Sequence, residues 1–179
     1  MPEQLNMPLQ LSTDRLNLVK RTHKYDVPLT KLIEDNRLFL QKYLVWPKFE
    51  KSFADIEKST AQMMSLWENK TQFSYLITDK KDVILGAIDI AHIRNSEGVV
   101  EVGYWLRKDK TGNGFATEAL TKVEEHIFST HIQKIELECE DTNLPSINIA
   151  LRCGYIETGH KEYSISEKAT IYLKSSQTI

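Results

Sequence analysis

Between residues 99 and 130 the spacing of the hydrophobic positions changes in the middle of the chain. From Val100 to Leu106 every second residue is hydrophobic, which is the period of a β-strand. From Phe115 on, the hydrophobic residues recur at positions 116, 119, 120, 123 and 127, which is helical spacing. Gly112 and Gly114 lie between the two patterns. This stretch therefore predicts a strand, a glycine turn and a helix, in that order.

The same criteria predict the other elements of the chain. In order, they are a strand over 14–20, a helix from 26, an irregular aromatic stretch over 36–48, a helix from 52, strands over 73–78, 83–91 and 99–106, the helix over 115–130, a strand over 132–139, a short helix over 143–152 and two final strands with a turn at 166–168. A helix that connects two neighbouring strands of one sheet leaves them parallel, so the strands around the 115–130 helix are expected to be parallel. The expected fold is α/β with a mixed, mostly antiparallel sheet.

Two helix starts have sequence signals. Asp26 is expected to cap the first helix, with Pro28 in its first turn. Ser52 and Asp55 resemble a capping box for the second helix, with Asp in place of Glu or Gln. The second helix is expected to turn its hydrophobic residues inward, namely Phe53, Ile56, Met63, Met64 and Trp67.

Length and composition indicate one globular domain. The chain has 179 residues, of which 41% are hydrophobic and 27% charged. We expect an irregular segment over 1–13 and a single domain over 14–174. The formal net charge of -2 gives no basic field that would favour nucleic acid.

The chain shows no signal for a membrane or for a metal. No signal peptide and no apolar run near 20 residues is apparent, so a cytoplasmic protein without membrane contact is expected. Cys139 and Cys153 are expected to be reduced thiols. The five histidines are scattered, and no metal site is expected.

The glycine turn is the first candidate for chemistry. Glycines at a strand-to-helix turn allow a ligand to approach the main chain, and the first N–H groups of a helix attract an anion. This favours a phosphate or pyrophosphate site. The alternative is a turn that needs two glycines only for its geometry.

Four stretches together resemble a known family. They are Phe39 to Pro47, Val102 to Leu106, Gly112 to Ala119, and Asn143 to Ser146 followed by Arg152 to Tyr155. They resemble the GNAT superfamily of acetyl-CoA-dependent N-acetyltransferases, and within it the bacterial ribosomal-protein-serine N-acetyltransferase subgroup. The likeness covers residues 16–173. It implies a GNAT-like acyl-CoA N-acyltransferase fold, with helices flanking the sheet.

The resemblance implies a site for acetyl-CoA, with no metal. The pyrophosphate would bind the N–H groups of Thr111, Gly112, Asn113, Gly114, Phe115, Ala116 and Thr117. Main-chain groups of Trp105, Leu106 and Arg107 would pair with the pantetheine arm. Asn143 and Ser146 would lie beside the thioester, where Asn143 equally fits a helix N-cap. Asp109 and Thr111 depart from the family's usual residues, which puts the tightness of cofactor binding in question.

The same resemblance assigns catalytic roles. Ser146 would protonate the leaving thiolate, with a solvent-exposed serine as the alternative. Glu162 matches the subgroup's carboxylate and Glu101 is its rival as general base. For each of them a solvated strand residue is the more common interpretation. Phe39, Tyr43 and Trp46, with Phe49, would form the acceptor wall, or else a small hydrophobic cluster under a loop.

These features predict an N-acetyltransferase that acts on a primary amine by direct attack on the thioester. An α-amine with a pKa of about 7.7–8.0 needs little help from a base, whereas a lysine amine at about 10.4 needs much more. An N-terminal α-amine is therefore favoured, and the resemblance implies that it belongs to a ribosomal or other protein. The alternatives are a non-catalytic acyl-CoA-binding module and an enzyme for a small amine such as a polyamine or aminoglycoside. The glycines alone would also fit a nucleotide-binding oxidoreductase, but a dinucleotide turn follows the first strand of a parallel unit. The acceptor's identity and a possible homo-oligomer stay open.

Overall fold

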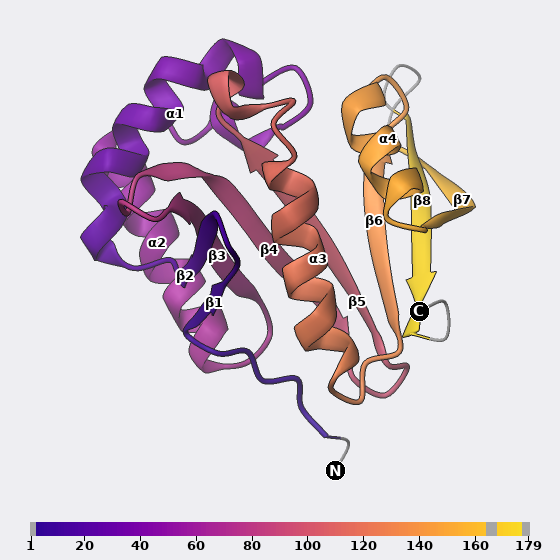
Figure 1. Cartoon of the computed structure of the whole chain (residues 1–179). Helices are drawn as coiled ribbons and strands as arrows, with labels where there is room; N and C mark the ends of the chain where they lie inside the picture. Colours follow the sequence, from indigo (N-terminus) through magenta and orange to yellow (C-terminus); the bar gives the residue numbers. More distant parts are fainter. Residues whose placement is uncertain (1–2, 164–167, 177–179) are drawn as a thin grey trace.

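A computed structural model of the chain describes residues 3–163 and 168–176. These residues form one eight-stranded sheet with the strand order β1-β2-β3-β4-β5-β6-β8-β7 (Figure 1). The strands are β1 Gln10–Ser12, β2 Leu16–Lys20, β3 Phe73–Asp79, β4 Ile84–Arg94, β5 Val99–Leu106, β6 Lys134–Glu140, β7 Ile156–Glu162 and β8 Lys168–Ser175. The helices are α1 Asp26–Leu40, α2 Phe53–Glu68, α3 Phe115–Phe128 and α4 Leu144–Arg152, with short 3-10 turns η1 His23–Tyr25, η2 Trp46–Lys48 and η3 Lys108–Lys110.

The sheet is mixed, as the sequence predicts. β5 and β6 are parallel, and the other neighbouring pairs are antiparallel. The parallel pair is the one that α3 connects, which confirms the expected crossover.

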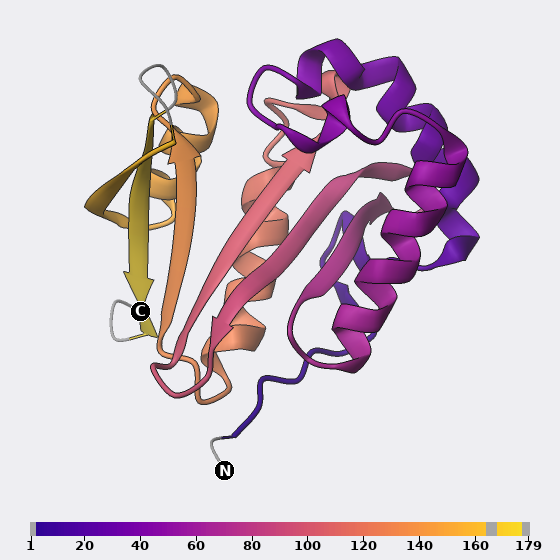
Figure 2. The same cartoon turned by 180° about the vertical axis from the view of Figure 1, so that it is seen from behind.

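Helices cover both faces of the sheet. α3 lies on one face and α1 and α2 on the other, as the two opposite views show (Figure 2). Side chains alternate between the faces along each strand. Tyr75 therefore packs in the core under α3, and the adjacent Leu76 packs against α1 and α2.

The start of α1 differs from the prediction, because the helix cap is Tyr25 and Asp26 is already helical. Asp26 is buried, and it accepts a hydrogen bond of 2.6 Å from the Thr60 hydroxyl on α2. The helix also continues to Leu40, so the expectation of irregular structure from residue 36 is wrong for its first turn.

The capping box of α2 is confirmed. The Ser52 hydroxyl accepts from the Asp55 N–H at 3.2 Å, and the Asp55 carboxylate accepts from the Ser52 N–H at 2.9 Å. Ile56 and Trp67 are buried as expected, but Phe53 is 44% exposed, so its inward placement is wrong. Phe53 is the first residue of the helix, where no neighbouring turn covers it.

The expectation of an irregular N-terminal segment is wrong for residues 10–12. They form β1, which pairs with β2 at the edge of the sheet. Leu5 and Met7, just before it, are buried in the core. A strand of three residues is too short to show an alternating pattern, so the sequence carries little signal for it.

The C-terminal part follows the predicted order. Asn143 caps α4, and Gly154 follows it with a positive φ of 84°. β7 and β8 pair as a hairpin. Lys168, expected in the turn, already belongs to β8, and residues 166–167 of the predicted turn lie outside the described residues. None of the helices in the described ranges is long and apolar enough to cross a membrane.

Candidate active site

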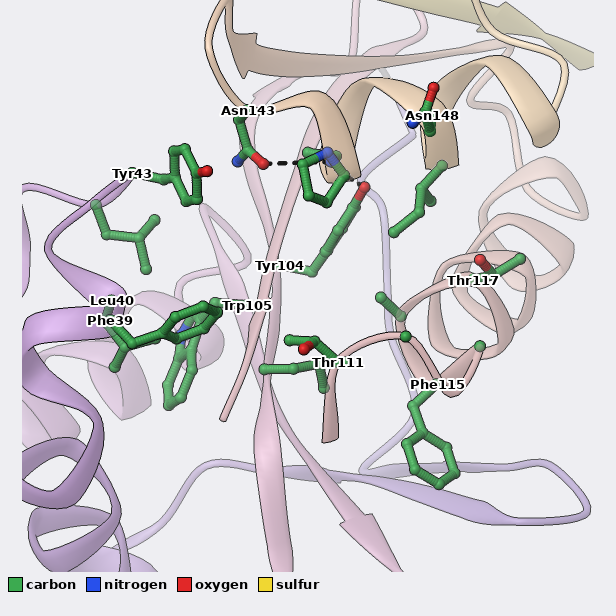
Figure 3. Close-up of a pocket in the computed structure, with 18 of the residues that line it drawn as sticks. Phe39, Leu40, Tyr43, Tyr104, Trp105, Thr111, Phe115, Thr117, Asn143 and Asn148 are labelled. Atoms are coloured by element: carbon green, nitrogen blue, oxygen red, sulfur yellow. Dashed lines mark hydrogen bonds between the residues drawn. The ribbon is translucent and has the colours of Figure 1, made fainter. Parts of the chain in front are cut away.

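β5 and β6 separate part-way along their length. Their ladder consists of the pairs Val99–Lys134, Val100–Ile135 and Glu101–Glu136, although β5 continues to Leu106 and β6 to Glu140. The last pair of the ladder is Glu101–Glu136, and the two strands diverge toward their carboxyl ends (Figure 2). A cavity of about 890 Å³ lies near their carboxyl ends, lined by the end of α1, the end of β5, the glycine turn and α4 (Figure 3).

The glycine turn forms one wall of this cavity. Gly112 and Gly114 have φ values of +75° and +78°, a region that favours glycine. A Cβ atom at Gly112 would have no neighbour within 4 Å, so the main chain there is open to a ligand. Gly114 is the N-cap of the 14-residue α3 and offers no side chain to its first N–H groups. These N–H groups can receive an anion, and the turn fits a pyrophosphate.

Asp109, the unexpected acid near this turn, has a cationic partner. Its carboxylate accepts a hydrogen bond of 2.6 Å from the Arg107 guanidinium. The pair brings no net charge toward the turn, which removes much of the expected repulsion of an anion.

Ser146 lies in a small group of protic side chains. Its hydroxyl is 3.2 Å from the Tyr104 hydroxyl and 3.3 Å from the Cys139 Sγ. Asn143 accepts a hydrogen bond of 3.3 Å from the Ser146 N–H, so Asn143 is a helix cap and lines the cavity as well. Ser146 also lines the cavity, where its hydroxyl can donate a proton.

Tyr104 and Cys139 were not among the predicted site residues. Burial raises the pKa of the Tyr104 hydroxyl above its ordinary value, and burial likewise raises the pKa of the Cys139 thiol. Both groups therefore stay protonated at neutral pH. Their strand pattern indicated only that they face the core, and the contact with Ser146 depends on how α4 packs on β6.

Glu101 lies where β5 and β6 begin to diverge. Because side chains alternate along a strand, it points to the face opposite Tyr104. Burial raises the pKa of the Glu101 carboxyl, although His92 and Lys161 nearby act in the opposite direction. Its neighbours Glu136 and Glu138 have partners, Arg94 at 2.7 Å and Lys161 at 2.6 Å. Glu101 does not line the cavity itself.

Glu162 lies apart from this arrangement. It is the last residue of β7 and pairs with Lys168, the first residue of β8. Its side chain is exposed and forms an ion pair of 2.9 Å with Lys168. It does not line the cavity. The structure therefore does not bring Glu162 and Ser146 together.

The predicted aromatic wall divides into two parts. Phe39 and Tyr43 line the cavity, together with Trp105 from β5 (Figure 3). Trp46 packs against Trp105 with ring centroids 5.5 Å apart. Phe49 is 72% exposed on the segment between α1 and α2.

The remaining predicted contacts are main-chain groups or lie in the turn. Leu106, Thr111, Phe115, Ala116 and Thr117 all line the cavity. Asn113 does not; its side chain donates to the Thr111 carbonyl at 2.9 Å and so braces the turn. Arg107 contributes its side chain to the ion pair with Asp109.

Comparison with protein families finds a match over most of the chain. Residues 15–156 match the model described as an acetyltransferase (GNAT) domain. The ribosomal-protein-serine acetyltransferase of Escherichia coli strain K12 is 31% identical over 133 residues, which are 74% of this chain and 74% of that protein.

Solved structures share the fold. A microcin self-immunity acetyltransferase, MccE, in complex with acetyl-CoA and AMP, is 28% identical with a TM-score of 0.85, covering 91% of this chain and 93% of that one. The ribosomal-protein acetyltransferase RimL, in complex with coenzyme A, is 21% identical with a TM-score of 0.86, covering 93% and 97%.

Proposed function

We propose that this chain, which belongs to the GNAT acetyltransferase family and is an acetyl-CoA-dependent N-acetyltransferase, acts on the N-terminal α-amine of a protein. One arrangement supports this most directly. The strands β5 and β6 diverge between a protic group on one face of the sheet and a half-buried carboxylate on the other. The similarity to a ribosomal-protein-serine acetyltransferase supports a ribosomal protein as the acceptor.

The donor side is the cavity beside α3 and α4. The N–H groups from Thr111 to Thr117 would hold the pyrophosphate, and the main chain of Trp105 to Arg107 would hold the pantetheine arm. When bound, acetyl-CoA supplies the acetyl group as a thioester. Asn143 and Ser146, at the start of α4, line the part of the cavity where the reacting end would lie.

Ser146 would act as the general acid. Its hydroxyl would donate a proton to the leaving sulfur, and the Tyr104 hydroxyl at 3.2 Å would donate to Ser146 in turn. Tyr104 can fill this role because its raised pKa keeps it protonated. Tyr104 is thereby a hydrogen-bond donor behind Ser146, which would stabilise the Ser146 oxygen as it gives up its proton.

Glu101 is the better-placed of the two candidate bases. It faces the side of the sheet that α1 and α2 cover over β2 to β4, with Trp105 at the end of β5 packed against the same cluster. The rest of β5 and β6 carries no helix on this side (Figure 2). Gly103, on the same face, is exposed, and a Cβ atom there would have no neighbour within 4 Å. An acceptor amine can therefore approach the diverging strands from this face and pass its proton to Glu101, directly or through water.

An α-amine suits this site better than a lysine side chain. Even with its raised pKa, the Glu101 carboxylate is a much weaker base than an amine, so it helps most where deprotonation costs little. Deprotonating an α-amine at neutral pH costs only about 1 kcal/mol, against about 4.6 kcal/mol for lysine. Phe49 and Phe53, exposed where the chain leads into α2, offer apolar contacts for the residues that follow the amine.

A small-molecule amine is the second candidate. The similarity to MccE, whose solved structure holds AMP, favours this alternative. The aromatic pair of Trp46 and Trp105 could contact a flat ring as readily as a peptide.

The two candidates separate in one assay. Thiol release from acetyl-CoA is measured with peptides that carry the N-terminal sequences of ribosomal proteins, including N-terminal Ser, and with polyamines, aminoglycosides and aminoacyl nucleotides. The matched control is each peptide with a blocked N-terminus and an internal lysine. We expect release with free N-termini only, and mass spectrometry should place the acetyl group on the α-amine. Release with small amines alone would contradict a protein acceptor.

A further inference from the structure

Arg15, at the start of β2, is far from the glycine turn in sequence but contacts it in three ways. Its Nη1 donates to the Asn113 carbonyl at 3.1 Å. Its Cζ lies 4.5 Å from the centre of the Phe115 ring. Its Nη2 would be 3.5 Å from a Cβ atom at Gly114. One side chain thus contacts the turn on both sides of its second glycine.

The same guanidinium also binds the first turn of α3. Its Nε and Nη2 lie 2.6 and 2.5 Å from the Glu118 Oε2. The other oxygen of Glu118 accepts from the Arg15 N–H at 3.2 Å and from the Thr13 hydroxyl. The corner between β1 and β2 is therefore joined to α3 through one carboxylate.

Glu118 creates an electrostatic problem for an anionic donor. It lines the same cavity as the glycine turn, close to the helix end that would receive a pyrophosphate. Partial burial acts to raise the pKa of Glu118, but the bonds from Thr13 and Arg15 outweigh it and leave the pKa below its ordinary value. The carboxylate is therefore ionised at neutral pH, and an unpaired charge there would repel the pyrophosphate.

We propose that Arg15 is a positioning residue for the donor, which fixes the shape of the glycine turn and neutralises Glu118 beside it. This inference rests on the proposed binding of acetyl-CoA at that turn. Arg15 acts through the turn and Glu118, because its Nε and Nη2 bind the carboxylate and its Nη1 binds the Asn113 carbonyl. The sequence gives no sign of it, because 98 residues separate Arg15 from Asn113.

Loss of Arg15 should weaken the binding only of donors that carry the pyrophosphate. Without the guanidinium, the turn loses its brace and the charge of Glu118 is unmatched, so acetyl-CoA binds more weakly. A thioester that lacks the pyrophosphate, such as acetyl-pantetheine, does not use the turn. The contacts of Arg15 include neither the Ser146 group nor Glu101 on the acceptor side, so both keep their geometry.

The experiment compares the wild type with Arg15→Ala, Arg15→Lys and Lys122→Ala. Lys122, also on α3, forms an exposed pair of 2.8 Å with Glu125 and is the matched control. For Arg15→Ala we expect the KM for acetyl-CoA and the Kd for CoA to rise about tenfold, with kcat within about twofold of the wild type. Arg15→Lys should recover part of the loss, because it restores the charge without the guanidinium fork. The KM for acetyl-pantetheine should stay the same in all four proteins.

Two results would overturn the role of Arg15. One is an unchanged KM and Kd for the CoA donors in Arg15→Ala. The other is an equal loss with acetyl-pantetheine, which would indicate general misfolding. Failure of the wild type itself to bind CoA would instead contradict the proposed function, so the two failures are distinguishable.

Discussion

At the scale of single residues, the site depends on groups whose protonation is set by burial. Ser146 has no charge of its own, and its usefulness comes from Tyr104 and Cys139 within 3.3 Å of its hydroxyl. Glu101 lies on the other face, with a pKa raised mainly by burial. A protonated donor and a carboxylate thus lie on opposite sides of the point where β5 and β6 part.

The Ser146→Ala substitution tests the acid. We expect kcat to fall by roughly a hundredfold, because a positioned proton donor is lost. The Kd for acetyl-CoA should hardly change, since the Asn143 side chain still accepts from the main-chain N–H of residue 146 and caps the helix. Steady-state kinetics and calorimetry measure the two quantities. Ser129→Ala, at the far end of α3, is the control, and an unchanged kcat in Ser146→Ala would exclude the role.

The Glu101→Gln substitution tests the base. A base acts in its deprotonated form, so the wild-type rate should rise with pH through the pKa of Glu101, above the range of an exposed glutamate. In Glu101→Gln we expect this rise of the rate with pH to disappear and the rate to fall by about tenfold or more. Glu162→Gln, which removes the exposed rival carboxylate, should keep the wild-type profile.

Stability separates this catalytic effect from misfolding. A carboxyl whose folded pKa is raised contributes stability at low pH and loses it as pH rises through that pKa. The ionised Glu101 therefore does not stabilise the fold at pH 7. The Tm of Glu101→Gln should be equal to or above that of the wild type at pH 7, and a clear drop would indicate that the carboxylate is structural.

At the scale of elements, the donor site is made by a turn and the helix after it. α3 follows its N-cap Gly114, whose φ of +78° allows the first N–H groups of the helix to face the cavity. The pattern from Val100 to Ile127 predicts this strand–turn–helix unit, because each of its periods is local. The bracing by Arg15 could not be predicted, since contacts across the sheet leave no periodic signal.

Gly114→Ala should affect the donor more than the fold. A Cβ at positive φ costs about 1 kcal/mol, and here it also approaches Arg15 at 3.5 Å. We expect a several-fold rise in the KM for acetyl-CoA, measured by thiol release. Gly98→Ala is the matched control, because it has a φ of +64° in the turn between β4 and β5, away from the cavity. It should lose similar stability without a change in KM; an equal change in both variants would contradict the prediction.

At the scale of the whole molecule, a buried ion pair joins α3 to the C-terminal strand. The Lys174 Nζ of β8 lies 2.7 Å from Glu124 of α3, and both side chains are largely buried. β8 pairs with β6 along its length, so this contact fixes the position of α3 relative to the diverging side of the sheet.

Lys174→Met should destabilise the protein strongly. Removal of the lysine leaves a buried carboxylate without its cation, which costs about 3 kcal/mol. The double variant Lys174→Met with Glu124→Gln should recover much of this loss, because the unpaired charge is gone. Denaturant unfolding measures both. If Lys174→Met were as stable as the wild type, the ion pair would not contribute to the free energy of unfolding.

The sequence by itself determined the order of most elements, the parallel pair around α3, the capping box of α2 and the glycine turn. These features depend on periodicity, caps and backbone conformations, all of which are local. The sequence-based predictions of β1, of the extent of α1 and of the exposure of Phe53 were wrong, because short strands and helix ends have weak local signals.

Only the tertiary structure decided which side chains meet. It placed Tyr104 and Cys139 beside Ser146, set Glu101 on the face opposite Tyr104 and left Glu162 in an exposed ion pair. It also brought Arg15 to a turn that lies 98 residues away from it in the chain. The physical reason is that sheet order and helix packing create contacts between distant segments, and no local pattern of residues records their distances.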